Sequence, residues 1–262
     1  MSLNSLFDYS IGDSPIIAVA LHDGHELREE VAQLTALDDS ERLREEDPFT
    51  GEWTGVVDNR IIVKTSRFEV DLNRSRDTSV YVAPEDAWGL NVWKTKPSED
   101  FVQRSLVEYD LFYKELEKIL SDMKRRFGKF VVFDLHSYNH RRNGSDAQPA
   151  DPDANPEVNV GTGTMTDRTR WARIIDRFIQ DLSGYNYCGR NLDVRENVKF
   201  YGRQLAQFAH EAFPDSACVL SVEFKKIFMD EWTGKPDREK INSISRGLQS
   251  TIPGILQELN KL

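Results

Sequence analysis

The sequence predicts an α/β protein, a single domain over residues 1–262 with a mixed, mostly parallel central sheet flanked by helices. Short apolar runs alternate with longer amphipathic stretches, the pattern of strands joined by crossover helices. No stretch has the composition of an interdomain linker. Hydrophobic residues make up 39% of 262 residues, which is enough for one sizeable core.

The lengths of the apolar runs and the spacing of apolar residues define the predicted strands and helices. Short, uninterrupted apolar runs are typical of buried strands, and apolar residues three and four apart are typical of helices that cover a sheet. Arg141–Glu157 contains three prolines and is predicted as a long loop, a kind of segment that is often functional. The predicted strands are Ile16–Leu21, Ile61–Val63, Phe68–Leu72, Phe130–Phe133 and Ala217–Val222; the predicted helices are Ser98–Arg126, Asp167–Leu182, Gln204–Phe213 and Arg238–Leu262, the last broken or restarted at Pro253.

Composition narrows the function classes. Asp and Glu total 44 against 34 Lys and Arg, so the formal net charge is −10. Nucleic-acid binding needs a basic face and a membrane span needs about 20 apolar residues in a row, and the sequence has neither. Met1–Ser5 lacks the basic start of a signal peptide, and Cys188 and Cys218 cannot build a disulfide framework. We therefore expect a cytoplasmic protein with free thiols, and the sequence leaves its oligomeric state open.

Two of the five histidines follow predicted strands. His22 comes directly after Ile16–Leu21, and His136 lies just beyond Phe130–Phe133. Ligands of open α/β sheets bind beyond the carboxyl ends of the strands. If both strands are central and parallel, the two imidazoles converge on one edge of the sheet. Two histidines with one carboxylate make a zinc site that leaves a position open for water.

Several acidic residues are candidates for the carboxylate of such a site. Glu26 lies four residues after His22, and Glu46 and Asp47 lie in a later acidic segment. Asp134 precedes His136 by two residues, so it is better placed to orient an imidazole than to bind a metal. From the residues alone, Glu26, Glu46 and Asp47 remain open as ligands.

Glu223 is a further acidic residue with a chemical interpretation. It interrupts the apolar run Ala217–Phe224 at the end of a predicted strand. Burying a carboxylate there is energetically unfavourable unless it forms an ion pair or takes part in the chemistry of a site. Near a zinc-bound water it would act as a general base. The structural alternative is an ion pair with Lys225 or Lys226 at a sheet edge.

Arginines gather in the same parts of the chain. Arginine suits bidentate carboxylate binding and stabilisation of an oxyanion. In an acidic chain, a local cluster of arginines is expected to attract an anionic substrate. The members of this cluster are Arg67, Arg74, Arg76, Arg141 and Arg142.

Other residues are expected to be structural. His25 and His140 are adjacent to candidate segments, but neighbouring side chains usually point apart. His210 is expected on the surface of the helix Gln204–Phe213, and three tryptophans are expected to serve packing only. These tryptophans are Trp53, Trp88 and Trp93.

Several short stretches of the chain form an ordered set that reaches from about residue 16 to 235: Leu21–Gly24, Ser66–Arg74, Asp134–Ser137, Asn159–Thr162, and Val222–Phe224 continuing to Phe228–Glu231. In their residues and their order, these segments resemble motifs of the N-formylglutamate amidohydrolase family. This family is similar to the zinc carboxypeptidase and aspartoacylase group. The resemblance implies a zinc-carboxypeptidase-like (phosphorylase/hydrolase-like) fold with a mixed eight-stranded sheet.

The resemblance also implies a metal site. His22 and His136 match the histidine ligands of one zinc ion per chain. Asp47 matches the carboxylate ligand best. Glu46 is the nearest alternative, and Glu26 would require a shift of one residue from the carboxypeptidase pattern.

Further roles follow from the same resemblance. Glu223 matches the general base, and Arg67 matches the arginine that stabilises the oxyanion. Asn73 and Arg74 match the pair that holds a substrate carboxylate. The chain departs from the family at Phe200–Leu205, where the formylglutamate enzymes carry a glycine- and histidine-rich segment.

These observations predict a zinc-dependent amidohydrolase that cleaves the linear amide of a small anionic N-acyl amino acid. N-formyl-L-glutamate, which would give formate and glutamate, is the type of substrate expected. One alternative is a carboxypeptidase-like hydrolase of a larger peptide or amide. Another is a non-catalytic protein of the same fold that binds an anionic metabolite. A pure binding protein needs no general base, so Glu223 favours an enzyme.

Overall fold

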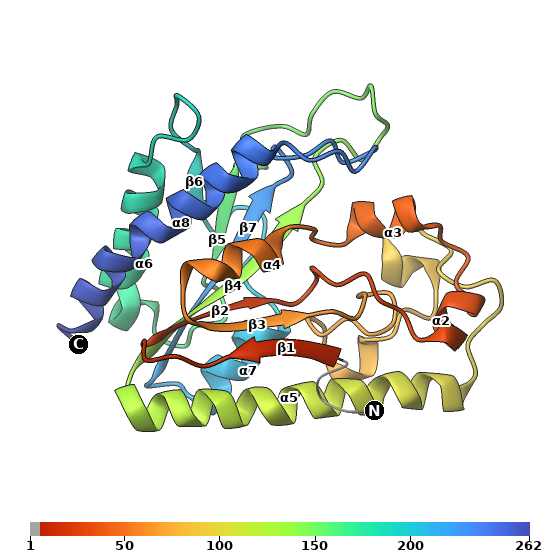
Figure 1. The fold of residues 1–262 in the computed structure, drawn as a ribbon, viewed down its shortest axis with the longest axis horizontal. Coiled ribbons are helices and arrows are strands. Elements are labelled where there is room, and N and C mark those ends of the chain that lie inside the picture. Colours follow the sequence, from red (N-terminus) through yellow and green to blue (C-terminus); the bar gives the residue numbers. More distant parts are fainter. Residues whose placement is uncertain (1–5) are drawn as a thin grey trace.

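A computed structural model describes residues 6–262 of the chain; Met1–Ser5, on which the expectation of no signal peptide rests, lie outside the described residues. The described residues form one central sheet with helices on both faces (Figure 1). Its strands are β1 (Phe7–Ser10), β2 (Ile16–Ala20), β3 (Asn59–Val63), β4 (Phe130–Tyr138), β5 (Val158–Gly161), β6 (Val194–Glu196) and β7 (Ala217–Lys225).

The strands lie in the order β1-β3-β2-β4-β7-β5-β6. Neighbouring strands are parallel except in the pairs β1–β3 and β5–β7. The centre of the sheet, β3-β2-β4-β7, is therefore parallel, and the carboxyl ends of its strands meet at one edge. The predicted α/β class with a mixed, mostly parallel sheet flanked by helices is confirmed.

Polar side chains begin the long helices. The side chains of Ser98, Asp167 and Asp237 accept hydrogen bonds from backbone N–H groups three residues later, which satisfies donors at the helix N-termini. Gly128, with φ of 74°, ends the longest helix. The helices are α2 (Glu29–Leu34), α3 (Asp39–Glu45), α4 (Thr50–Trp53), α5 (Glu99–Phe127), α6 (Arg168–Gly184), α7 (Gln204–Ala212) and α8 (Arg238–Leu259), with short 3-10 turns at Thr54–Val56, Arg76–Thr78 and Pro84–Ala87.

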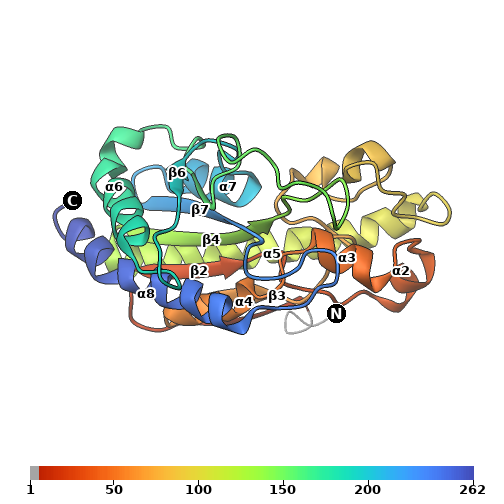
Figure 2. The same ribbon diagram turned by 90° about the horizontal axis from the view of Figure 1, so that it is seen from above.

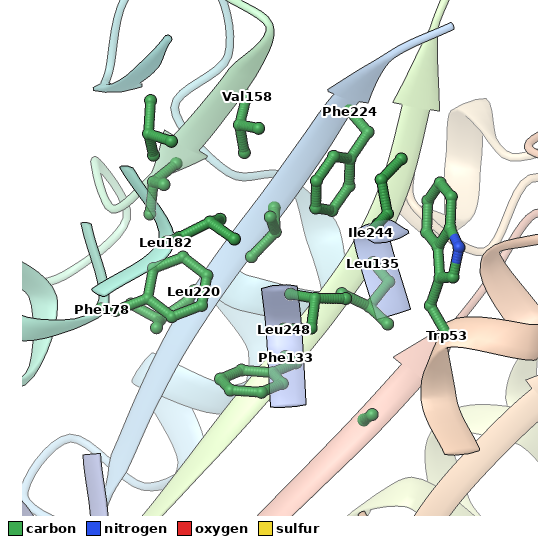
Figure 3. Close-up of a cluster of buried hydrophobic side chains, with 14 of the residues drawn as sticks. Trp53, Phe133, Leu135, Val158, Phe178, Leu182, Leu220, Phe224, Ile244 and Leu248 are labelled. Carbon is green, nitrogen blue, oxygen red and sulfur yellow. The ribbon is translucent and has the colours of Figure 1, made fainter. Parts of the chain in front are cut away.

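Each face of the sheet buries its own apolar cluster, because side chains alternate along a strand. Phe133 of β4 belongs to the cluster that also holds Phe178 of α6 and Leu248 of α8 (Figure 3). Val132, one residue earlier, belongs to the opposite cluster with Leu116 of α5. The sheet is therefore covered by α6 and α8 on one face and by α5 and α7 on the other.

The face covered by α5 and α7 changes character toward the carboxyl ends of the strands. Val132 of β4 is followed on this face by Asp134 and His136. On the neighbouring strand β7, Ser221 and Glu223 stand directly beside Asp134 and His136 in the parallel register. The segment that follows β4 also lies at this end of the sheet (Figure 2). This edge carries the polar groups that the sequence analysis singled out.

One predicted strand is wrong. Phe68–Leu72 forms turns, and the described residues contain seven strands where the resemblance implied eight. In a half-buried strand the alternate residues Glu69 and Asp71 would face solvent. Both side chains are fully buried and ion-paired, Glu69 with Arg28 and Asp71 with Arg67. The segment therefore has no side that faces solvent, as a half-buried strand would have.

Two other expectations need correction. Pro253 lies inside α8 without ending it, since buried residues on both sides, among them Leu248 and Ile255, hold the helix against the sheet. His210 is buried in α7, where its ring bonds the Thr164 hydroxyl and the Val219 backbone N–H. None of the helices in the part of the chain that the structure describes is long and apolar enough to cross a membrane.

Candidate active site

His22 and His136 come from the two central parallel strands. β2 and β4 are neighbours in parallel register, His22 lies two residues beyond the end of β2, and His136 lies on β4. Both side chains are buried, and their ring centroids are 5.0 Å apart. The convergence that the sequence analysis expected from two central parallel strands is present.

Asp47 lies between the two imidazoles. Its Oδ2 atom is 3.2 Å from His22 Nδ1 and 3.0 Å from His136 Nδ1. The segment that carries Asp47 is fixed from two directions: the Asp47 N–H donates to the His22 carbonyl, and Lys226 Nζ donates to the carbonyls of Arg44 and Glu46. Asp47 is as buried as the two histidines.

Each histidine has a second carboxylate behind it. His22 Nε2 is 2.8 Å from Asp71 Oδ1, and His136 Nε2 is 2.8 Å from Asp134 Oδ1. The Ser221 hydroxyl donates to the other oxygen of Asp134 at 2.8 Å. A carboxylate at Nε2 favours the tautomer that carries its proton there, which leaves the Nδ1 lone pair directed at Asp47.

This donor set fits a divalent cation. One ring nitrogen each of His22 and His136 and a carboxylate oxygen of Asp47 lie within 4.8 Å of one another, and Asp47 Oδ2 is closest to the two Nδ1 atoms. With Nε2 protonated, three electron-rich atoms face one another in a buried space, an arrangement that a cation stabilises. Tetrahedral zinc ligands lie about 3.3 Å apart, close to the distances from Asp47 to the two nitrogens. Nitrogen and oxygen donors suit zinc and also other divalent ions.

The pKa shifts in this cluster indicate that its carboxyl groups are ionised. Burial by itself raises the pKa of Asp47, but the hydrogen bonds from His136 and His22 outweigh it and hold that pKa well below its usual range. Burial also opposes the charged form of Asp71, and Arg67 and His22 reverse the effect, so its pKa is lowered as well. For His136, burial is outweighed by Asp134, which raises the pKa of the imidazole.

Glu223 lies beside His136 on the adjacent strand. The two residues are paired in the parallel register of β4 and β7, so their side chains share a face of the sheet. Burial raises the pKa of Glu223 to about 7. Among the described residues its carboxylate makes no hydrogen bond or ion pair, and neither Lys225 nor Lys226 pairs with it. A carboxylate that is unpartnered and titrates near neutrality is suited to proton transfer.

Arg67 lines the same pocket and is held rigidly. Its Nη2 atom is 2.8 Å from Asp71 Oδ2, and its Nη1 donates to the Glu45 carbonyl. The guanidinium lies over the ring of Trp88, 4.9 Å from its centroid. Asp71 keeps the pKa of Arg67 above its ordinary value despite burial. The result is a fixed cation at the pocket that contains His22 and Glu223.

The structure separates Asn73 from Arg74. Asn73 lines the pocket, and its carboxamide nitrogen is 3.2 Å from His136 Nε2. Arg74 is not part of this lining. Its guanidinium donates to the Asp86 carbonyl and stacks on the Tyr81 ring. It faces a second cavity that also touches Asn73.

The alternative carboxylates lie away from the histidines. Glu46 points into a different cluster, where it bonds the His25 ring and the Ser66 hydroxyl. Glu26 is exposed on a bridge to Thr65. The structure therefore brings Asp47 to His22 and His136 and leaves Glu46 and Glu26 outside the group.

Four residues of the site were missed or misjudged in the sequence. Asp71 alternates with apolar residues in Phe68–Leu72, a pattern that places it on the solvent face of a strand, so its burial gave no local signal. Lys226 appeared only as an ion-pair partner, and Trp88 only as packing, although it is 44% exposed and lines the pocket mouth. Arg203 gave no signal beyond its place in the segment that departs from the family.

The fold and site define an α/β protein with a buried histidine–carboxylate cluster at the carboxyl ends of parallel strands. A profile of the N-formylglutamate amidohydrolase family matches residues 14–228. The chain belongs to this family. A search of curated proteins finds no significant match.

Two solved structures show the same fold. The crystal structure of N-formylglutamate amidohydrolase from Ralstonia eutropha JMP134 superposes with a TM-score of 0.76 at 16% identity, covering 98% of this chain and 99% of that chain. A gene product from Agrobacterium tumefaciens superposes with a TM-score of 0.68, also at 16% identity, covering 98% and 96%. At this identity the two structures establish the fold alone.

Proposed function

We propose that this protein hydrolyses the amide of an N-acyl amino acid, with N-formyl-L-glutamate as the type of substrate, and that His22, Asp47 and His136 hold one zinc ion. The observation that carries the proposal is the convergence of these three buried donors beside the unpartnered carboxylate of Glu223. Membership of the amidohydrolase family supports hydrolysis of an amide. The name of the similar Ralstonia protein supports the formyl substrate.

Glu223 carries the proton transfers in this proposal. A divalent ion on the three donors would polarise the amide carbonyl and lower the pKa of a water. Glu223 accepts a proton from the attacking water as the new bond from oxygen to the carbonyl carbon forms. It then gives that proton to the amide nitrogen as the C–N bond breaks, which yields a carboxylic acid and a free amine. A pKa of about 7 lets one group do both.

Arg67 and Asn73 would act on the substrate and the site from the opposite wall. The Arg67 guanidinium is positioned to stabilise negative charge on the carbonyl oxygen in the transition state. Because Asp71 and Trp88 already hold it in place, little reorganisation is required when charge develops. Asn73 contacts the His136 ring and faces the pocket, where it can also hydrogen-bond a substrate.

Glu223→Gln tests the proposal. Its carboxamide keeps the shape of the side chain but accepts no proton, so we expect kcat for N-formyl-L-glutamate to fall about 10²–10⁴-fold while zinc content and affinity stay near the wild-type values. Glutamate release measures kcat, elemental analysis measures the zinc content, and calorimetry measures the affinity. Arg173→Ala, at an exposed position of α6, is the matched control and should behave as wild type.

Two results would count against the proposal, the first against the role of Glu223 and the second against the enzyme. Full turnover by Glu223→Gln would remove Glu223 from the mechanism. A wild-type protein that binds N-formyl-L-glutamate but releases no glutamate would support the binding protein instead.

A further inference from the structure

A second cavity continues from the catalytic pocket. The pocket that contains His22, His136 and Glu223 has a volume of about 80 Å³, and the neighbouring cavity has a volume of about 470 Å³. Asn73 and Arg203 line both, so they mark the junction. A metal ion and the scissile amide would occupy much of the smaller space, so the remainder of a substrate would extend from it.

The second cavity has a distinct chemistry. Its lining is polar, with hydroxyls and carboxamides beside two arginines, Arg74 and Arg203. In the described part of the chain, no aspartate or glutamate lines it. A cavity with cations and neutral hydrogen-bonding groups but no carboxylate favours an anionic ligand. The neutral lining groups include Ser75, Thr78, Gln204 and Gln207.

Arg203 differs from the other cations of the catalytic pocket. Arg67 is paired with Asp71, and Arg142 is paired with Glu45. Lys226 donates to two backbone carbonyls. Within residues 6–262, Arg203 makes no side-chain hydrogen bond, ion pair or ring contact. It is the cation of this pocket whose charge is not already satisfied by the protein.

The backbone that carries Arg203 is seated firmly on the sheet. The Asn159 side chain of β5 accepts hydrogen bonds from the N–H groups of Val198 and Lys199 and donates to the Phe200 carbonyl. A side chain at Gly161 would come within 2.5 Å of the Gly202 nitrogen, so only glycine allows this approach. The Asn159–Thr162 motif thus positions the segment that ends at Arg203.

We infer that Arg203 binds a carboxylate on the amine half of the substrate, and that the second cavity accommodates this half. The inference rests on the proposed function and adds to it the residue that selects an acidic amine half. Arginine binds carboxylates through two parallel hydrogen bonds, and here the bond forms without breaking an existing ion pair. The resemblance gave the binding of the substrate carboxylate to Arg74. In this inference Arg203 takes the main part of that role, and Arg74 shares it.

The test measures binding in chains that carry Glu223→Gln, so that turnover does not interfere. The probes are N-formyl-L-glutamate and its neutral diamide, titrated by calorimetry into the zinc-loaded protein. Arg203→Ala should lower the affinity for the diacid about 10–100-fold and change that for the diamide less than about twofold. Arg203→Lys should recover part of the loss, and Arg173→Ala should show none.

The outcomes separate the inference from the proposed function. An equal loss for both probes, no loss for either, or no measurable binding of N-formyl-L-glutamate to the parent chain would overturn the role of Arg203. If the wild type releases no glutamate while the binding pattern holds, the proposed function fails and the role of Arg203 stands.

A second variant tests the cavity itself. Gln207 lies on α7 and lines the second cavity without lining the catalytic pocket. Gln207→Trp should fill part of the cavity and weaken binding of both probes by about the same factor, since the effect is steric. Unchanged affinity for both would show that the amine half lies elsewhere.

Discussion

The candidate active site is built half from strands and half from turns. Asp134, His136 and Glu223 stand on β4 and β7, where the parallel register sets the direction of every second side chain. Asp47 and Asp71 lie in irregular segments beside turns, and both are held by contacts with His22, which is 25 and 49 residues away in the chain. The strand half is positioned by backbone geometry. The turn half depends on individual polar contacts, so single substitutions should disturb it more.

The sharpest way to test this comparison is to change the two carboxylates that hold the histidines. Asp134→Asn and Asp71→Asn should each lower zinc affinity about 10–100-fold, because each replaces the charged carboxylate behind an imidazole with a neutral amide, a weaker acceptor. Asp71→Asn should have the larger effect, since Arg67 and Tyr81 also lose a partner. Chelator competition measures both.

An Asp71→Asn variant with smaller losses than Asp134→Asn would contradict the proposed difference between the halves. The isosteric substitutions keep the size of the side chain, so a change in circular dichroism would indicate misfolding and not a local effect.

A second prediction concerns the anchor of the turn half. Buried Glu69 is paired with Arg28, and Glu108 of α5 lies 3.6 Å from the same guanidinium. Burial, with the charge of Glu69, raises the pKa of Glu108 from its ordinary 4.5 to about 8. The folded chain therefore keeps a proton that the unfolded chain releases near pH 4.5. This group's contribution to stability should fall as pH rises from about 4.5 to about 8 and then level off.

Glu108→Gln removes this titration and keeps the side-chain shape. Its Tm should change less between pH 5 and pH 8 than the wild-type Tm, by roughly 5 °C, with the variant more stable at pH 8. Identical pH profiles from scanning calorimetry would show that Glu108 is ionised in the folded protein at pH 5.

The smallest expected effect is at the pocket mouth. Trp88 lies between Arg67 and Arg142, with the guanidinium carbons 4.9 and 5.6 Å from its ring centroid. Cation–π contacts at exposed sites are worth about 0.5–1 kcal/mol each. Trp88→Ala should therefore raise KM for N-formyl-L-glutamate about 2–5-fold and leave zinc content unchanged. A loss of zinc would show that Trp88 supports the metal site as well.

The same division explains what the sequence could predict. His22 and His136 follow apolar runs whose parallel pairing was expected, so their meeting could be deduced from topology. The fold class and the long helices followed from periodicity. Phe68–Leu72 was misassigned because the burial of Glu69 and Asp71 depends on contacts with Arg28 and His22, which are 41 and 49 residues away in the chain.

The direction in which side chains of the turns point could not be predicted from the sequence. Arg74 adjoins Asn73 in the chain, yet only Asn73 lines the catalytic pocket, because Asp86 and Tyr81 hold the Arg74 guanidinium away from it. Arg203 reaches the pocket from a segment 130 residues later, seated there by Asn159. Such placements depend on tertiary contacts that no local pattern encodes.

The most direct measurement of the central claim is the metal content of the purified protein by elemental analysis. Wild type should contain about one equivalent of zinc, and His22→Ala and His136→Ala should contain none. His25→Ala, whose ring bonds Glu46 outside the cluster, is the matched control and should retain the ion. A folded wild-type protein that holds no metal and takes up none on addition of zinc would contradict the claim.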